Sequence, residues 1–418
     1  MPQRRLLAPL AISALVVAAA AGASFWRPAE ANPAPAPTPV SDEVFADVVR
    51  NGEAGFVATE FAYALGPDAS ASNACPRGLT GGVRGLVEQL KARPEGARRE
   101  GESDQGYQRR LNMMVNTAPN GQNICMNPQA GPTDPNWRMV EGRDAIAQGI
   151  DLDGDGKGKG KSAATCGHPE FRGAQGQRGI DNQFYRVIGC TTGFQSTGAG
   201  NGFQTEMYTG SWGILVSLKG VDSLANDPEV EVGIYANADP LQLSAARNAL
   251  PFATYAVHRD KRYHATAKGR IVNGVLTSGA MDVRLINVVN SMSEDRELRD
   301  ARVRLTFTPD GGMEGYLAGY SPIDSIYNVQ FGVRTSRNAK GELAPERMRI
   351  QTSVGRAGAL GYSCNGVYQA MQQAADGHRD PATGRCTTIS TQYKIRLMPA
   401  FVVDTKTQSI NAPLAMRK

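Results

Sequence analysis

The chain has 418 residues, and its 45 Lys and Arg residues exceed its 40 Asp and Glu residues by enough to give a formal net charge of +5. So small a surplus gives no reason to expect a nucleic acid as partner, because phosphate binding needs a concentrated basic surface. The length is more than one small core needs and allows one large domain or two.

The first 31 residues are typical of a secretory signal. Two arginines precede an uncharged stretch at 6–26, and an A-x-A-like cleavage site ends at Ala31. The uncharged stretch is long enough to span a bilayer, so an uncleaved membrane tether is the alternative. We therefore expect a signal peptide at 1–31, a Pro/Ala-rich tether at 32–41, and a mature protein in the periplasm or outside the cell.

A loop-rich, partly helical region is expected over 42–190. Ser41 followed by two acids is typical of a helix start, and the helix pattern ends before Gly52. A second helix is predicted before Pro94, which interrupts a pattern of apolar residues at helical spacing. The charged, glycine-containing stretch 95–106 and the Asn-, Pro- and Gly-rich stretch 116–137 predict loop.

The cysteines of an exported chain predict disulfides, and here their number is even. No two have the C-x-x-C spacing of zinc ribbons or thioredoxin-type sites. Because loop closure costs least between neighbours along the chain, we predict that each cysteine pairs with the next one. The predicted pairs are Cys75–Cys125, Cys166–Cys190 and Cys364–Cys386.

One motif has residues suited to metal binding. The sequence DLDGDG starts at Asp151 and offers carboxylates at alternate positions, which is the spacing that places oxygen ligands around a hard divalent cation. It resembles the first half of an EF-hand calcium loop, with Asp151, Asp153 and Asp155 at positions one, three and five, Gly156 at the sharp turn, and Lys157 offering its carbonyl. The resemblance implies a structural Ca²⁺ ion.

The second half of the loop departs from the EF-hand pattern, because Ser162 stands where a bidentate Glu closes the cage. Asp181 and Asn182, from the sequence GIDNQ, are the predicted additional ligands. The alternative interpretation is a solvated turn whose acids are neutralised by Lys157 and the two lysines that follow it at alternate positions.

From about Gln183 the pattern changes to that of strands. Asn273-Gly274 between two β-branched arms predicts a hairpin, and the residues around Gly311 predict the turn of a second. Strands at this spacing without intervening helices favour antiparallel sheets that pack as a sandwich or close as a barrel. Further predicted strands occupy 183–190, 211–221, 230–236, 253–259, 326–336 and 386–404.

One late helix is predicted near 363–376, where Val367 and Met371 share a face and Gly377 stands as the C-terminal cap. The region 191–418 is therefore expected to be an antiparallel β-rich domain that includes this helix. The predicted fold class is mainly β, or α+β with a β-rich core.

Two classes of function are compatible with these features. The preferred one is a binding or structural protein, whose ligand is an unknown protein or glycan. Aromatic residues of the strand-rich half could line a sugar- or peptide-binding face, although core packing explains them more simply. The alternative is an exported hydrolase, glycan-directed, that uses paired carboxylates drawn from acids such as Glu206, Asp282 or Glu314.

Overall fold

The computed structural model describes residues 41–68, 74–141, 145–154, 166–195, 203–210 and 212–404. The predicted signal peptide lies outside the described residues, as do all but the last residue of the predicted tether and two of the predicted metal ligands, Asp155 and Lys157. Within the described ranges, no helix combines the length and the apolar character needed to cross a membrane.

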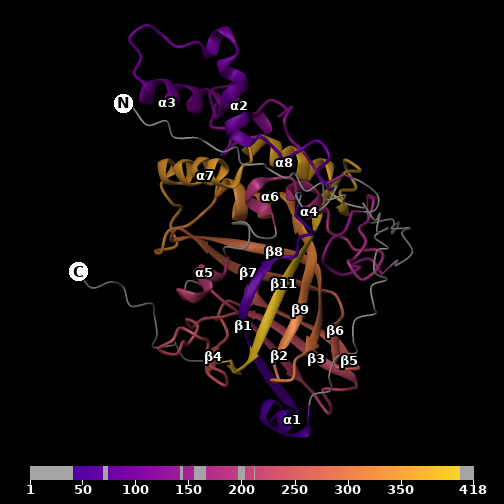
Figure 1. Cartoon of the computed structure of the whole chain (residues 1–418). Coiled ribbons are helices and arrows are strands. Elements are labelled where there is room, and N and C mark those ends of the chain that lie inside the picture. Colours follow the sequence, from indigo (N-terminus) through magenta and orange to yellow (C-terminus); the bar gives the residue numbers. More distant parts are fainter. Residues whose placement is uncertain are drawn as a thin grey trace, which may run out of the picture. The chain divides into compact units, whose positions relative to one another are not determined.

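Eight antiparallel strands form a sheet that closes on itself, because the first of them pairs with the last as well as with its next neighbour. This arrangement confirms the predicted antiparallel β-rich fold in its barrel-like form (Figure 1). The ring runs in the order β1 (Glu53–Tyr63), β2 (Ile214–Lys219), β3 (Asp227–Ala236), β5 (His264–Val272), β6 (Val275–Ser278), β8 (Met292–Phe307), β9 (Met313–Pro322) and β11 (Cys386–Pro399).

Four shorter or outlying strands lie beside this ring. β7 (Met281–Val289) pairs with β8 and β10 (Gly377–Arg379) pairs with β11, while β4 (Thr254–Ala256) and β12 (Phe401–Val403) form a separate parallel pair.

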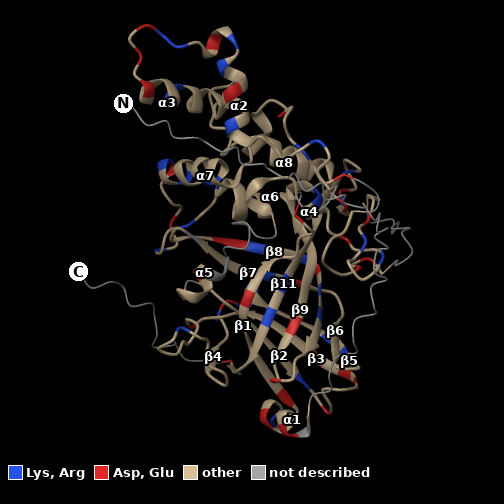
Figure 2. Cartoon of the chain, in the orientation of Figure 1, with Lys and Arg blue, Asp and Glu red and all other residues tan. Residues whose placement is uncertain are grey.

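Alternation along the strands places apolar side chains inside the closed sheet and polar ones outside. On β11, Tyr393 and Ile395 belong to the main core. Arg396 faces outward and lies opposite Glu60 of β1 on one side and Glu314 of β9 on the other. Figure 2 shows this acid–base–acid row across the three strands.

Helices gather mainly at one end of the closed sheet, with α1 at the opposite end (Figure 1). The α-helices are α1 (Asp42–Val48), α2 (Gly82–Lys91), α3 (Asp104–Val115), α4 (Gln183–Ile188), α5 (Phe203–Tyr208), α6 (Ile323–Tyr327), α7 (Glu346–Leu360) and α8 (Cys364–Gln373). Shorter turns are the 3₁₀ helices η1 (Pro94–Gly96), η2 (Pro128–Ala130), η3 (Thr192–Phe194) and η5 (Lys261–Tyr263), and the π-helix η6 (Asn328–Gly332).

Two predicted strands are wrong, since 183–190 contains α4 and 326–336 contains the end of α6 and η6. In the fold both runs are buried on nearly every side, so the pattern of their apolar residues does not distinguish a buried helix from a strand. For α4 the decisive residue is Asn182, whose side-chain oxygen accepts a hydrogen bond from Tyr185 N at 3.2 Å and so caps the helix. The helices α1, α2 and α8 are confirmed, whereas the sequence pattern does not predict α3 or α7.

All six cysteines form disulfides, as predicted, and three such bonds fit an oxidising environment, extracellular or periplasmic. The predicted pairing is wrong. The bonds join residues 115, 239 and 220 positions apart. Loop-closure entropy grows only with the logarithm of loop length, about 0.6 kcal/mol per doubling, so packing outweighs it. The observed pairs are Cys75–Cys190, Cys125–Cys364 and Cys166–Cys386.

Candidate metal centre

We call the segment that carries the DLDGDG sequence the acidic loop. Its described residues, 151–154, lie on the outer face of β9 and β11. Leu152, in the middle of the DLDG sequence, is buried and packs with Ala318 and Tyr320 of β9. This contact fixes the loop by its one apolar side chain, and the two aspartates that flank Leu152 are left half-buried at its edge.

Gln392 holds the loop in place. Its position on β11 points outward, yet the residue is only 1% exposed because the loop covers it. Its Nε2 donates to the carbonyl oxygens of Ile150 at 2.8 Å and of Asp181 at 2.7 Å, and its Oε1 accepts from Ile150 N at 3.1 Å. One side chain thereby joins the two segments that carry the predicted metal ligands. Gly149 has a φ of +143° and no room for a Cβ, which would lie 2.6 Å from the Gln392 side chain.

Three carboxylates converge at this point. Asp151, Asp153 and Asp181 each offer an oxygen atom, and these atoms lie within 4.8 Å of one another. Oxygen ligands of one Ca²⁺ ion, at about 2.3–2.6 Å from it, are at most about 5 Å apart, so the spacing fits a single cation. We call these three residues the acidic cluster.

Backbone hydrogen bonds set the orientation of two of the carboxylates. Oδ2 of Asp181 accepts from Leu152 N at 2.7 Å and from Asp153 N at 3.3 Å, and Oδ1 of Asp151 accepts from Gly154 N at 2.7 Å. The loop therefore wraps around the Asp181 carboxylate through its own backbone N–H groups.

Burial makes this concentration of acids costly. Asp181 is 6% exposed, and burial raises its pKa to about 8, more than the Leu152 N–H lowers it. The nearby carboxylates of Asp153 and Asp376 add to the rise. Burial likewise raises the pKa of Asp376 to about 7, although its Oδ1 accepts from Ser390 N at 2.7 Å. A bound divalent cation would favour the ionised carboxylates and remove this cost.

The Cys166–Cys386 disulfide anchors the chain that leaves the acidic loop. The described chain resumes at Cys166, which is bonded to the first residue of β11. Cys166 N also donates to the carbonyl oxygen of Asp376 at 3.0 Å. The described segments that end at Gly154 and begin at Cys166 are thus each attached to β11, the first through Gln392 and the second through Cys386.

Of the six predicted ligands, three meet in the acidic cluster. Asn182 does not, because its side chain caps α4 and donates through Nδ2 to Ala64 O at 2.6 Å and Gln148 O at 3.0 Å. Asp376 and Gln392 were not predicted, since both reach the site through the tertiary fold from more than 200 positions beyond Asp151. No local pattern marks either of them.

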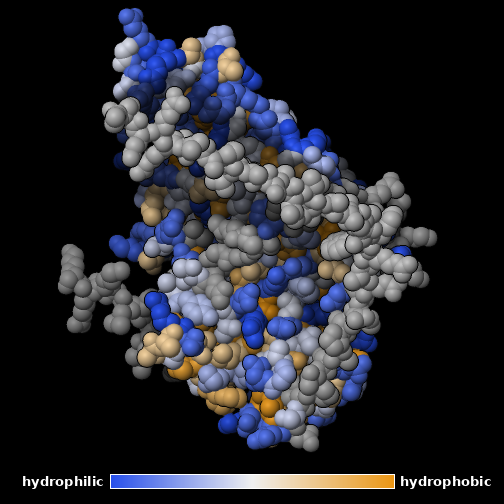
Figure 3. Space-filling model, viewed as in Figure 1, coloured by the Kyte–Doolittle hydropathy of each residue, from blue (hydrophilic) through white to orange (hydrophobic). Residues whose placement is uncertain are grey.

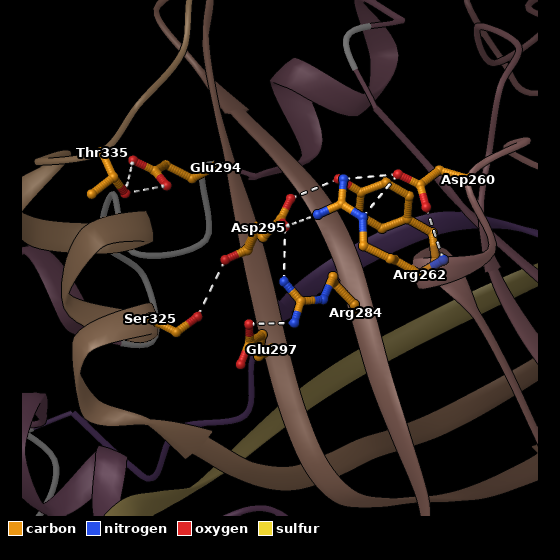
Figure 4. Close-up of polar contacts among 9 residues, drawn as sticks. Asp260, Arg262, Arg284, Glu294, Asp295, Glu297, Ser325 and Thr335 are labelled. Atoms are coloured by element: carbon orange, nitrogen blue, oxygen red, sulfur yellow. Dashed lines mark hydrogen bonds and ion pairs between the residues drawn. The ribbon is translucent and has the colours of Figure 1, made fainter. Parts of the chain in front are cut away.

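A second acidic group lies around Asp295 on β8 (Figure 4). Its carboxylate accepts from the Tyr263 hydroxyl at 2.7 Å and contacts Arg284 at 2.9 Å and Arg262 at 3.4 Å. Arg284 also pairs with Glu297 at 2.6 Å. We call this group the Asp295 network. It consists of Asp260, Arg262, Tyr263, Arg284, Asp295 and Glu297, and it ties β7 and β8 to η5 through arginine–carboxylate contacts.

The acids named for the hydrolase alternative do not gather in one group. They belong to α5, β7 and β9, where Glu206 is half-buried and Asp282 and Glu314 are exposed. Glu314 lies opposite Arg396, and Asp282 Oδ1 accepts from Asp300 N at 3.1 Å. In the described part of the chain, the acidic cluster is the only set of three or more metal-type ligands this close together.

Comparison of the chain with models of protein families, with curated proteins and with solved structures finds no match. The function must therefore be inferred from the residues of the molecule themselves.

Proposed function

We propose that the chain is an exported, disulfide-stabilised protein with a binding or structural role, in which a Ca²⁺ ion fastens the acidic loop onto the sheet. The observation that supports the proposal is the convergence of Asp151, Asp153 and Asp181 over β9 and β11. The function of the ion is structural, because it joins two chain segments that already share Gln392 as an anchor.

Calcium is the favoured ion for three reasons. The ligands are carboxylate oxygens, which suit hard cations rather than zinc or copper. The sequence offers further oxygen ligands in Asp155 and the Lys157 carbonyl, as the EF-hand-like pattern implies. An exported protein also meets calcium concentrations that fill sites of 10⁻⁴ to 10⁻³ M affinity, roughly the range of extracellular calcium modules.

Export is supported by the three disulfides and by the signal-like sequence at 1–31. We infer a periplasmic or secreted protein, released by cleavage or held by its N-terminal segment. N-terminal sequencing of the protein recovered from the producing cell tests this, and a mature start near residue 32 is expected.

Thermal melting with and without calcium tests the metal proposal. We expect a higher melting temperature in calcium than in EDTA, with a smaller effect of magnesium. The change Asp153→Asn keeps the side-chain shape and should abolish the calcium-dependent shift. The control Asp47→Asn alters an exposed acid of α1 and should keep the shift. Equal melting temperatures in calcium and EDTA for the unaltered protein would contradict the proposal.

A further inference from the structure

A cavity of about 630 Å³ lies on the outer face of the sheet, on a different stretch of its wall from the acidic cluster. Residues of β1, β2, β3 and β5 line it, and β12 with Phe252 and Val257 forms its side. Its volume is within the range of about 300–1,000 Å³ that is usual for small-molecule sites. Figure 3 shows apolar side chains gathered over the β4 region, where Leu250 and Phe252 are exposed.

Small residues in one cross-strand row lie beneath this cavity, and all of them except Gly233 line its floor. Gly55 of β1 pairs with Ser217 of β2, which pairs with Gly233 of β3, which pairs with Thr266 of β5. All four positions face outward. At Gly55 a Cβ would lie 2.5 Å from the carbonyl oxygen of Ala400, so the glycine lets the chain before β12 approach the sheet.

A tyrosine ring lies across the middle of the floor. A Cβ on Gly233 would lie 2.2 Å from the Tyr235 hydroxyl oxygen, so the ring rests directly on the glycine. The Ser217 hydroxyl donates to the Tyr235 hydroxyl at 3.3 Å and holds the ring in this position. Tyr235 lines the cavity, and its ring also packs against the apolar cluster beside β12 that includes Tyr255 and Ala400, so the ring is held firmly in the cavity wall. His264 meets the ring at an interplanar angle of 83°.

The rim carries charges of both signs. Glu53, Lys219 and Glu231 are cross-strand neighbours in one row, and Lys219 Nζ lies 3.5 Å from Glu231 Oε1. Arg50 and Asp404 add one charge of each sign. Such a rim offers hydrogen-bond donors and acceptors with little net charge, so it suits an uncharged polar ligand better than a phosphate or a polyanion.

An extended peptide is a poorer candidate, because it is usually bound by adding a strand to a free sheet edge. β1, β2, β3 and β5 each have a neighbour on both sides within the closed ring. Their backbone groups are therefore occupied along most of the floor.

We propose that this cavity binds a neutral oligosaccharide, with one sugar ring stacked on Tyr235 and hydroxyl groups bonded to the rim. The polarised C–H groups of a sugar ring fit the negative face of an aromatic ring, and its hydroxyls donate and accept equally well. The inference rests on the binding role proposed above, and it does not depend on the calcium ion.

A glycan array with neutral and anionic oligosaccharides of defined sequence tests this, using the purified exported protein. Binding to at least one neutral oligosaccharide is expected, and the dissociation constant of that compound is then measured by calorimetry. Tyr235→Ala should weaken binding at least tenfold, whereas the control Tyr107→Ala, on α3, should change it less than twofold. Thr266→Trp fills the floor from an exposed position and should abolish binding even if Tyr235→Ala does not fold.

Binding to no neutral oligosaccharide, or to anionic ones alone, would overturn the inference. Binding that Thr266→Trp leaves unchanged would also overturn it. The variant Asp153→Asn separates the two proposals, because it should lose the calcium response and keep the oligosaccharide.

Discussion

The acidic cluster and the Asp295 network contain the same residue type in two different electrostatic settings. Around Asp295, arginines and a tyrosine hydroxyl contact the carboxylates, and the Asp295 side chain is 32% exposed. Around Asp181, the carboxylates of Asp153 and Asp376 raise its pKa further, and burial is nearly complete.

This difference in charge compensation indicates why the acidic cluster, unlike the Asp295 network, is suited to bind a cation. In the Asp295 network, two arginines on β7 and η5 contact three carboxylates and offset most of their negative charge within the fold. At the acidic cluster, backbone N–H groups orient Asp181, and its pKa rises to about 8. A divalent cation would do there what the arginines do in the Asp295 network.

The largest expected effect comes from the Cys166–Cys386 disulfide, which joins the chain after the acidic loop to β11. Replacing Cys166 and Cys386 together by serine opens a loop of 220 residues, which should lower the free energy of unfolding by about 5 kcal/mol. The same change should weaken calcium binding. The double replacement of Cys75 and Cys190 is the control, with a similar loss in denaturant unfolding but an unchanged calcium affinity.

Calcium withdrawal should have the next largest effect. Saturation at about 100 times the dissociation constant adds roughly 2.7 kcal/mol to the free energy of unfolding, and EDTA should remove that amount. Urea unfolding curves measured at several calcium concentrations check the value. If calcium still stabilises the Asp153→Asn variant by the same amount, the ion binds at another place in the protein.

pH should act on the acidic cluster in two ways. In the folded state the pKa of Asp181 is raised to about 8 and that of Asp376 to about 7. Without calcium, the protonated carboxyl groups therefore stabilise the fold fully below about pH 4. This contribution to stability is lost as the pH rises through 7 to 8. Protons also compete with the ion, so calcium affinity should fall up to about tenfold per pH unit below pH 7, which is about 1.4 kcal/mol per unit. Calorimetry at pH 5.5, 6.5 and 7.5 measures this, and a flat affinity would contradict it.

The smallest effect is expected in the Asp295 network. Arg284→Met removes the contacts to Asp295 and Glu297, but these side chains are about one third exposed, so the loss of stability should be about 1 kcal/mol. High salt should mask part of it, and calcium should not restore it. Restoration by calcium would show that the two groups are not electrostatically distinct.

Local chemistry in the sequence predicted local structure well. Asn273 and Gly274 have φ angles of 50° and 73°, as a two-residue hairpin turn requires, and they join β5 to β6. The DLDG spacing likewise predicted that Asp151 and Asp153 lie together, and the nearby Asp181 joins them.

The sequence does not predict features that depend on how the outer face of the sheet is covered by loops or shaped into a cavity. Gln392 has no signal as an anchor, because an outward glutamine on a strand is ordinarily exposed. The row from Gly55 to Thr266 contains one residue from each of four strands, and these residues become neighbours only through the register in which the strands pair. The same applies to the disulfides, whose partners are set by the closed sheet and not by chain distance.

A calorimetric titration with calcium tests the central comparison most directly, using the unaltered protein, Asp181→Asn and Asp295→Asn. We predict one calcium ion per chain, lost in Asp181→Asn and retained in Asp295→Asn. Calcium binding that survives Asp181→Asn, or that Asp295→Asn abolishes equally in a folded protein, would contradict the account.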